Sequence, residues 1–456
     1  KLLCCNSSTA TGGTVTPSTI SYVGTPTGEI DSPFDDPNGF KFGDGNDQII
    51  KCGTFIPDSN GKATVNLGWE PQWWLWKKTT GSGGWGCYDA MRGVVTGDND
   101  HYLEFHNTND ENNTDVLTFT PTGVECVLSS HPGSTFLYVA VRRPDGYVGK
   151  PAEAGTSVFN VVAGTSSANP TFISGFPVDF MMQRKIAQTQ DWYTGLRLTG
   201  DKNMRANDTI AETTSGSSST WRWDYSEGWH EYSADQTANR SWMWKRNAGF
   251  DVVAVKPKGP GSAGETIRHN LNQVPEMIWA KTRGQNSSWS VYHKGLNGGT
   301  NPEQYRLKLD SDELQQNTGY AWNNEAPTAT TFRVGSWYDN QDCVFMLFSS
   351  VQGISKCGYY TGSSSGPVIT LGFKPRLIII KRTDGTGHWC TYDTTRGLGG
   401  TGIDDIVMFI NDTGAQISGY DYFDMVGSGT TAGFQHIRND SSLNSNGGKY
   451  IYYAHA

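Results

Sequence analysis

An aspartate and an arginine follow a tryptophan at the same spacing in two distant parts of this 456-residue sequence. The two sets are Trp85, Asp89 and Arg92, and Trp389, Asp393 and Arg396. A carboxylate and a guanidinium three residues apart can form an ion pair across a turn, or can bind a polar ligand together. We interpret each pair as a clamp on a turn, and keep a repeated ligand-binding pair as the alternative.

The same tryptophan recurs twice more, as Trp192 and Trp289. A flat indole ring can stack on a sugar, but a tryptophan at one register in every copy is typical of a core or inter-sheet residue. In the third copy His293 takes the place of the aspartate and the arginine is missing, which weakens the ligand-binding alternative. A lysine that ends each apolar run, such as Lys281 or Lys381, is expected to emerge at the end of the sheet.

One aromatic segment does not repeat, and is therefore a candidate recognition surface. In TWRWDYSEGWHEY the aromatic residues alternate, so that one face of a strand would be aromatic. Its candidate residues are Trp221, Trp223, Tyr225, Trp229 and Tyr232. We expect this face to bind a ligand, or to pack against a neighbouring domain or subunit.

Signatures of enzyme chemistry are missing from the sequence. It has no GxSxG, HExxH or P-loop motif and no CxxC pair, so we predict no catalytic residue, no metal site and no cofactor. The acidic loops at 44–47, 97–100 and 310–313 lack EF-hand spacing and are predicted to be solvated turns. Two carboxylates for glycoside hydrolysis have no sequence signature, so a depolymerase stays open as an alternative.

The elements that must position these residues belong to a unit that occurs four times. Pro71, Pro177, Pro275 and Pro375 each precede an apolar strand, at intervals of about one hundred residues. A unit of this length can bury its own core, so we predict four separate beads. The predicted ranges are an extended connector at 1–47 and domains at 48–146, 155–249, 250–353 and 354–456, of which the second is the most divergent.

Composition indicates the fold class. With 55 Gly, 12% aromatic and 18% charged residues, and apolar runs of four to seven residues, the chain is predicted to be all-β, with sandwich-like domains. Runs such as 377–380 are apolar at consecutive positions, so both faces of those strands should be covered. Cys52 and Cys357 occupy equivalent positions and are predicted to be buried, reduced thiols.

Charge and hydropathy bound the partners. The net charge is −9 and no basic stripe is present, so nucleic acid is not expected as a ligand. No apolar stretch approaches the roughly 18 residues of a membrane-spanning helix, so no membrane insertion is expected. Sixteen tryptophans on a string of domains would leave apolar patches, which favours association with other copies.

The K-C-G strand, the LG(W/F)xP strand with its lysine, the W…YD…RG turn and the closing aromatic strand cover about 48–456. With these motifs the chain resembles repeat-containing structural proteins, labelled tail fibre or minor virion protein, of tailed bacteriophages of aquatic bacteria. The resemblance implies a virion location, assembly in the host cytoplasm, contacts with other virion proteins and, by analogy with fibres, a homotrimer.

From the repeats and the resemblance together we expect a non-enzymatic virion protein of the tail fibre or spike type. Its tandem domains would attach to a glycan or another receptor on the host surface. Two alternatives remain at this point: a decoration or scaffold protein that only contacts neighbouring subunits, and a capsule polysaccharide depolymerase.

Overall fold

The computed structural model describes residues 50–90, 94, 100–142, 154–214, 221–232, 235–257, 264–271, 273–399 and 402–456. The predicted connector at 1–47 and Arg92 lie outside these residues. Within them the chain is all-β, as predicted: antiparallel strands and short 3-10 turns are present, and none of the described segments is an α-helix.

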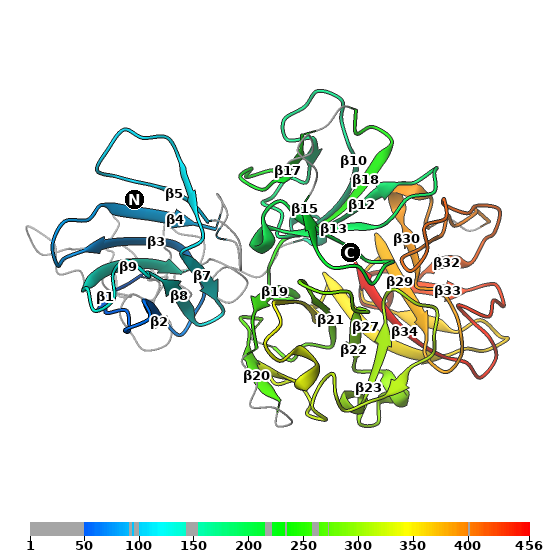
Figure 1. Ribbon diagram of the computed structural model, residues 1–456. Coiled ribbons are helices and arrows are strands. Elements are labelled where there is room, and N and C mark those ends of the chain that lie inside the picture. The colour runs from blue at the N-terminus through cyan, green and yellow to red at the C-terminus, as the bar shows by residue number, and fades with distance from the viewer. Residues whose placement is uncertain are drawn as a thin grey trace, which may run out of the picture.

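The N-terminal domain (50–142) is a sandwich of two antiparallel sheets (Figure 1). Its large sheet has the order β1 (Ile50–Phe55), β9 (Phe136–Arg142), β3 (Pro71–Lys78), β4 (Trp85–Asp89), β5 (Asp100–Leu103) and β6 (Asn112–Thr114). Its small sheet has the order β2 (Lys62–Asn66), β8 (Gly123–Val127) and β7 (Leu117–Thr120). Trp74 and Trp76 of β3 pack between the two sheets.

The second domain (155–244) repeats this arrangement. Its large sheet has the order β10 (Phe159–Ala163), β18 (Asn239–Trp244), β12 (Phe180–Lys185), β13 (Tyr193–Leu196), β14 (Lys202–Arg205) and β15 (Thr213–Thr214). Its small sheet has the order β11 (Phe172–Ile173), β17 (Gly228–Glu231) and β16 (Trp221–Arg222).

The third domain (250–348) has the same large sheet and a smaller second sheet. The large sheet has the order β19 (Phe250–Val255), β26 (Cys343–Phe348), β21 (Met277–Thr282), β22 (Ser290–His293), β23 (Tyr305–Lys308) and β24 (Gln316–Asn317). The second sheet pairs β20 (Glu265–Arg268) with β25 (Thr331–Val334).

The fourth domain (355–455) completes the series. Its large sheet has the order β27 (Ser355–Thr361), β34 (Lys449–His455), β29 (Leu377–Arg382), β30 (Cys390–Asp393) and β31 (Met408–Phe409). Its small sheet has the order β28 (Val368–Thr370), β33 (Gly433–His436) and β32 (Phe423–Val426). In all four domains the proline-associated strand therefore pairs with the closing strand on one side and with the tryptophan-associated strand on the other.

The glycine of the K-C-G strand makes room for a tyrosine of the closing strand. A Cβ atom on Gly358 would lie 2.3 Å from the ring of Tyr452, and one on Gly53 would lie 2.8 Å from Tyr138. Each glycine pairs with its tyrosine across the ladder. The glycine recurs because the aromatic ring lies over the bare backbone.

The second, third and fourth domains are not separate beads, and this prediction from the sequence is wrong. One continuous core contains buried residues from all three, including Trp244, Phe348 and Tyr453. Aromatic rings meet at each boundary: Trp244 with Phe250, Phe348 with Tyr453 and Phe159 with His455. We call residues 155–456 the three-domain ring; in Figure 1 it surrounds the C-terminal strand, and the N-terminal domain stands to one side.

The large sheets of the ring are therefore buried on both faces, as the consecutive apolar residues predicted. In β29, Ile378 and Ile380 face the core of their own domain, whereas Leu377 and Ile379 belong to the shared core. The ring also closes on itself, because Ala456 packs on Gly155: a Cβ atom on Gly155 would lie 2.3 Å from the carbonyl oxygen of Ala456.

Candidate functional site

The recurring tryptophans hold the three-domain ring together. Trp192 donates its indole N–H to the carbonyl of Phe409 (2.7 Å), Trp289 to that of Arg205 (2.8 Å) and Trp389 to that of Lys308 (2.8 Å). The second domain thus bonds to the fourth, the third to the second and the fourth to the third. The three acceptors are equivalent positions, so the contacts form a closed cycle.

A buried cation repeats the same cycle. In the second domain Arg184 donates to the carbonyls of Asp412, Thr413 and Gly414 in the fourth. Lys281 of the third donates to Thr209 of the second, at 2.9 Å. These two side chains occupy the same register in β12 and β21, four residues after Phe180 and Met277, both of which pair with the last residues of their closing strands.

Lys381 completes this set in the fourth domain. It donates to the carbonyls of Asp312 (3.2 Å) and Glu313 (2.9 Å) in the third domain. Burial lowers the pKa of Lys281 and of Lys381 to about 8. The expectation that these lysines emerge at the sheet end is wrong, because both are fully buried and satisfy carbonyls of a neighbouring domain.

Backbone hydrogen bonds join the same segments. Ser287 N–H donates to Thr209 and Glu212 N–H to Arg283, at 2.7 Å each. The equivalent residues form the other two boundaries: Gln190 to Thr413 and Gln416 to Ile186, and Gly387 to Asp312 and Gln315 to Thr383. Tryptophan, cation and backbone thus recur as one contact set at all three boundaries of the ring.

The sugar-stacking alternative is wrong for three of the four tryptophans. Trp192, Trp289 and Trp389 are 1%, 0% and 1% exposed, so no ligand reaches their faces. Trp85 alone is half-buried. It lies in the N-terminal domain, outside the ring.

The Asp–Arg pair of the fourth domain is buried and has a further contact. Arg396 Nε donates to Asp393 Oδ2 at 2.6 Å, and Trp242 of the second domain donates its indole N–H to the same oxygen at 3.0 Å. In the third domain His293 takes this position and its Nε2 lies 3.2 Å from the carbonyl of Tyr452 in the fourth domain. The position therefore serves a domain boundary in both. In the N-terminal domain Asp89 is half-buried.

Most of the non-repeating aromatic surface is a small core. Trp221, Trp223 and Trp229 are buried between the small and large sheets of the second domain. Their indole rings are not accessible to a ligand, so the prediction that they form a recognition surface is wrong for these three residues. Tyr225 is half-buried and bonds to Asn169, and Tyr232 alone is well exposed, at 63%.

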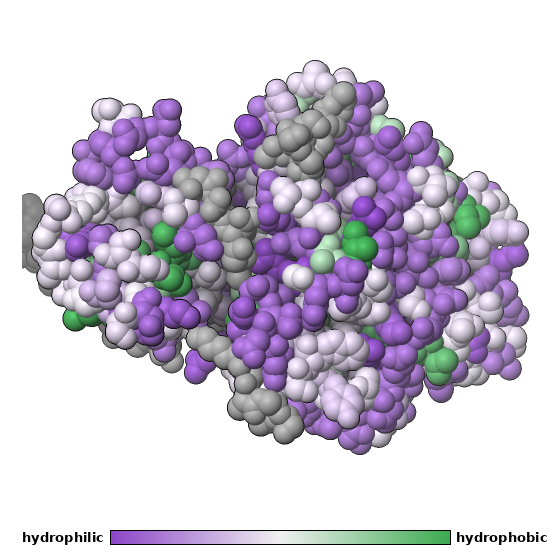
Figure 2. All heavy atoms as spheres, in the orientation of Figure 1, coloured by the Kyte–Doolittle hydropathy of each residue, from purple (hydrophilic) through white to green (hydrophobic). Residues whose placement is uncertain are grey.

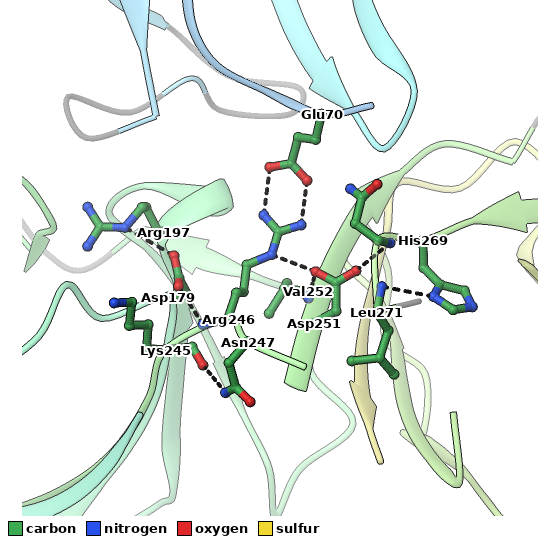
Figure 3. Close-up of polar contacts among 11 residues, drawn as sticks. Glu70, Asp179, Arg197, Lys245, Arg246, Asn247, Asp251, Val252, His269 and Leu271 are labelled. Carbon is green, nitrogen blue, oxygen red and sulfur yellow. Dashed lines mark hydrogen bonds and ion pairs between the residues drawn. The ribbon is translucent and has the colours of Figure 1, made fainter. Parts of the chain in front are cut away.

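A buried ion pair joins the N-terminal domain to the ring (Figure 3). Both terminal nitrogens of Arg246 donate to the carboxylate of Glu70, which precedes β3; the Nη1–Oε1 distance is 2.6 Å. Arg246 Nε also donates to Asp251 Oδ1 at 2.6 Å, and its backbone N–H to Asp179 Oδ2 at 2.7 Å. Because the arginine and both of its carboxylate partners are buried, their charges are compensated by each other and not by water.

The N-terminal domain carries the counterpart of the ring interface, and among the described residues no other domain buries it. Cys52, Trp73, Leu75, Trp85 and Val139 lie on the outer side of its large sheet, and Phe105 follows the end of β5. None of these six apolar residues is buried, whereas Cys87, which is opposite Leu75 on the same side, is. We call these six residues the open face. Phe105 is 59% exposed. Figure 2 shows a group of hydrophobic atoms at the surface of the N-terminal domain.

Cys52 and Cys357 show the difference between the two settings. Cys357 is fully buried in the shared core, whereas Cys52, at the same register of β1, is exposed. The prediction that both are buried is therefore wrong for Cys52. All six cysteines among the described residues are free thiols.

Some residues that join the domains were missed by the sequence analysis. Arg184 could have been found, since it matches Lys281 after a one-residue insertion behind Pro177. Glu70 and Arg246 belong to no repeat and carry no local signal. The DSDE loop at 310–313, predicted to be a solvated turn, is part of a domain boundary, since the carbonyls of Asp312 and Glu313 accept from Lys381 of the fourth domain.

The described residues offer neither a metal site nor a membrane-spanning helix. They contain no group of three or more His, Cys, Asp or Glu side chains placed to hold a metal ion. They contain no helix that is long and apolar enough to cross a membrane.

The fold and its contacts define a class: an all-β protein of four repeated domains, three of which share one core. Residues 194–456, more than half of the chain, match the family described as Domain of unknown function (DUF7483), and the chain belongs to this family. The match begins in β13 of the second domain and covers the rest of the ring. No curated protein and no solved structure matches the chain.

Proposed function

We propose that this chain is a structural, non-catalytic protein of a tailed-phage virion, of the tail fibre or spike type, which presents its three-domain ring for attachment to the host surface. One observation carries the structural part of the proposal. The recurring ring residues with reactive or polar side chains, namely Trp192, Trp289, Trp389, the buried cations and Asp393, are used in contacts between domains. A site that repeats in order to bind a ligand would keep those groups accessible.

The virion assignment is supported by the resemblance of the repeated motifs to phage structural proteins. A rigid body suits such a role, because an attachment protein must hold the particle at a defined distance and orientation to the cell. The shared core and the repeated boundary contacts make the three ring domains one body.

For a receptor contact we propose the exposed aromatic residues on the ring surface. Tyr232 is 63% exposed and Tyr320 is 69% exposed. Trp337 is 37% exposed, with the guanidinium of Arg306 4.0 Å from the centre of its ring. Exposed rings beside a cation suit the apolar faces and hydroxyl groups of a glycan.

A decoration or scaffold protein is the second candidate, and the open face favours it. An uncovered apolar sheet indicates a subunit contact. Immunogold labelling of purified particles with an antibody against the chain separates the two proposals. Label on the tail tip, with saturable binding of the purified chain to host cells, supports attachment; label spread over the capsid supports decoration and contradicts attachment.

Capsule degradation is tested with the same purified chain. A fall in the viscosity of the host polysaccharide, dependent on the chain, would contradict a non-catalytic role. Tyr232→Ala and Tyr320→Ala should weaken cell binding without lowering the melting temperature, whereas Val127→Ala, at an exposed site on the N-terminal domain, should change neither.

A further inference from the structure

We infer that the open face of the N-terminal domain packs against the N-terminal domains of two further copies of this chain. The three N-terminal domains would then form an intermolecular ring, held by the same contacts that join the domains of the three-domain ring. The inference does not depend on where the chain is located or what it attaches to. It uses only the repeat of the fold within the chain.

The strand composition is the first argument. In β29 of the ring, consecutive apolar residues serve two cores, one inside the domain and one shared between domains. In β3, Trp74 and Trp76 face the domain core, while Trp73 and Leu75 lie on the open face. The two strands pair alike, since Trp73 is opposite Asp89 and Leu377 is opposite Asp393. The large sheet of the N-terminal domain therefore has the sequence of a sheet that is covered on both faces, whereas the described residues cover only its inner face.

The polar groups of the ring interface are also present. Lys77 matches Lys381, and its ammonium donates to the carbonyl of Gly83, as Lys281 does to the equivalent Ser287 within its own domain. In the ring, the lysine donates in addition to a neighbouring domain. The corresponding acceptor for Lys77 is the carbonyl of Thr108 in another copy, because Thr108 occupies the register of Thr209.

The tryptophan has an acceptor of the same kind. The backbone N–H of Trp389 donates to Asn411, and that of Trp85 donates to His106, which fixes the register of the two loops. Phe409, the acceptor of Trp192, lies two residues before Asn411. The indole of Trp85 should therefore donate to the carbonyl of Glu104, two residues before His106, in a neighbouring copy.

Closure selects three copies. In the ring each domain offers the donors to one neighbour and the acceptor carbonyls to the other, and this head-to-tail step closes after three domains. Identical N-terminal domains that use the same donors and acceptors repeat the same step and close at the same number. A dimer would leave one open face and one set of carbonyls unused.

Light scattering on the full chain tests the number of copies. At micromolar concentration we expect a mass about three times the 50.0 kDa of one chain. Leu75→Asp and Phe105→Asp should each give the single-chain mass, since a carboxylate would be buried without a partner. Val127→Asp is the matched control: Val127 is also exposed, at 48%, but lies in β8 of the small sheet. It should leave the trimer intact.

The outcomes separate the inference from its rivals. A wild-type chain that stays monomeric, or that stops at a dimer, overturns it. A trimer that survives both Leu75→Asp and Phe105→Asp also overturns it, because another surface must then hold the copies together. Unchanged circular dichroism of both variants shows that the domain still folds, which the exposure of Phe105 predicts.

Thiol reactivity gives an independent readout at one residue. Cys52 is exposed in a single chain, and the same position in the ring, Cys357, is fully buried. Alkylation mapped by mass spectrometry should therefore be slow at Cys52 in the wild type and at least tenfold faster in Leu75→Asp. Equal, fast alkylation of Cys52 in the two proteins contradicts burial of the open face.

Discussion

The indole N–H of Trp389 lies 2.8 Å from the carbonyl oxygen of Lys308, in a different domain. The same bond joins Trp289 to Arg205 and Trp192 to Phe409. The local sequence is consistent with a tryptophan in the core of one domain, but its side chain forms a hydrogen bond between two domains. Removing it should therefore lower the stability of the whole ring.

Trp389→Ala should destabilise the ring by about 3–5 kcal/mol, the range for truncating a buried large aromatic side chain. Trp389→Phe keeps most of the ring volume and removes the N–H, which leaves the carbonyl of Lys308 unpaired and should cost about 1–3 kcal/mol. Chemical denaturation measures both. The second, third and fourth domains should unfold in one transition, which these variants shift.

Trp337→Ala is the control for this series. Trp337 is 37% exposed and contacts Arg306 through its face, so its truncation should cost about 1 kcal/mol or less. If Trp389→Ala cost no more than Trp337→Ala, the role of Trp389 at the domain boundary would be contradicted.

Glu70→Gln should loosen the N-terminal domain from the ring. It removes the charge that faces Arg246, and breaking a buried ion pair costs about 3–5 kcal/mol. Asp251 remains 2.6 Å from Arg246, so the lower end of that range is expected. Small-angle scattering should report a larger maximum dimension, and limited proteolysis should cut faster between the N-terminal domain and the ring.

Glu325→Gln provides the comparison. Glu325 is half exposed and lies 3.5 Å from Arg333, and surface pairs contribute about 0–1 kcal/mol. It should change neither the scattering nor the cleavage. An unchanged maximum dimension in Glu70→Gln would show that other contacts hold the N-terminal domain in place.

The ring should lose stability in acid through His293. Burial lowers the pKa of His293 to about 3 from the ordinary value of 6.5. Gly295 N–H donates to its Nδ1 at 2.9 Å, so a proton on that nitrogen would displace a bond. The folded chain binds fewer protons than the unfolded chain below pH 6.5, so stability is complete above that pH and falls as the pH drops toward 3.

The expected loss from His293 at pH 5 is about 2 kcal/mol, from 1.36 kcal/mol for each pH step below the unfolded pKa. His436 and His455, whose pKa values burial lowers to about 3 and about 4, act in the same direction. Asp405 opposes them, because burial raises its pKa to about 6. Melting temperature against pH checks the slope, and His293→Gln should make it shallower; an identical slope would rule out His293 as a source.

Gly358→Ala should destabilise the fourth domain by about 1–3 kcal/mol, because the new methyl group would meet the ring of Tyr452. Gly284→Ala is the matched control, since a Cβ atom there meets no other atom within 4 Å. Comparison of the two melting temperatures is sufficient. Equal melting temperatures would mean that Tyr452 moves aside at no cost.

The sequence was informative where a pattern has one structural meaning. Prolines at one interval predicted four units, and the consecutive apolar residues of 377–380 predicted a strand covered on both faces. What covers the second face could not be predicted, because a tryptophan in a domain core and one at a domain boundary have the same local sequence. Cys52 and Cys357 share a motif and differ in burial for this reason.

The prediction of a recognition surface on the non-repeating aromatic segment was wrong for a related reason. The alternation of aromatic residues correctly predicted that Trp221 lies on one face of a strand, but it did not predict whether that face points inward or outward. The small sheet of the second domain turns it inward, onto Met181 and Met243 of the large sheet. Tyr232, beyond the end of β17, escapes this packing.

The contact between Gly155 and Ala456 bears on how the protein would carry a mechanical load. The polypeptide enters the ring at Gly155 and, after three domains, reaches Ala456 beside that same point. Tension applied along the backbone across these two residues would act between adjacent atoms at one place on the rim. The shared core would lie beside the line of force, so tension between these two residues would not pull the three domains apart.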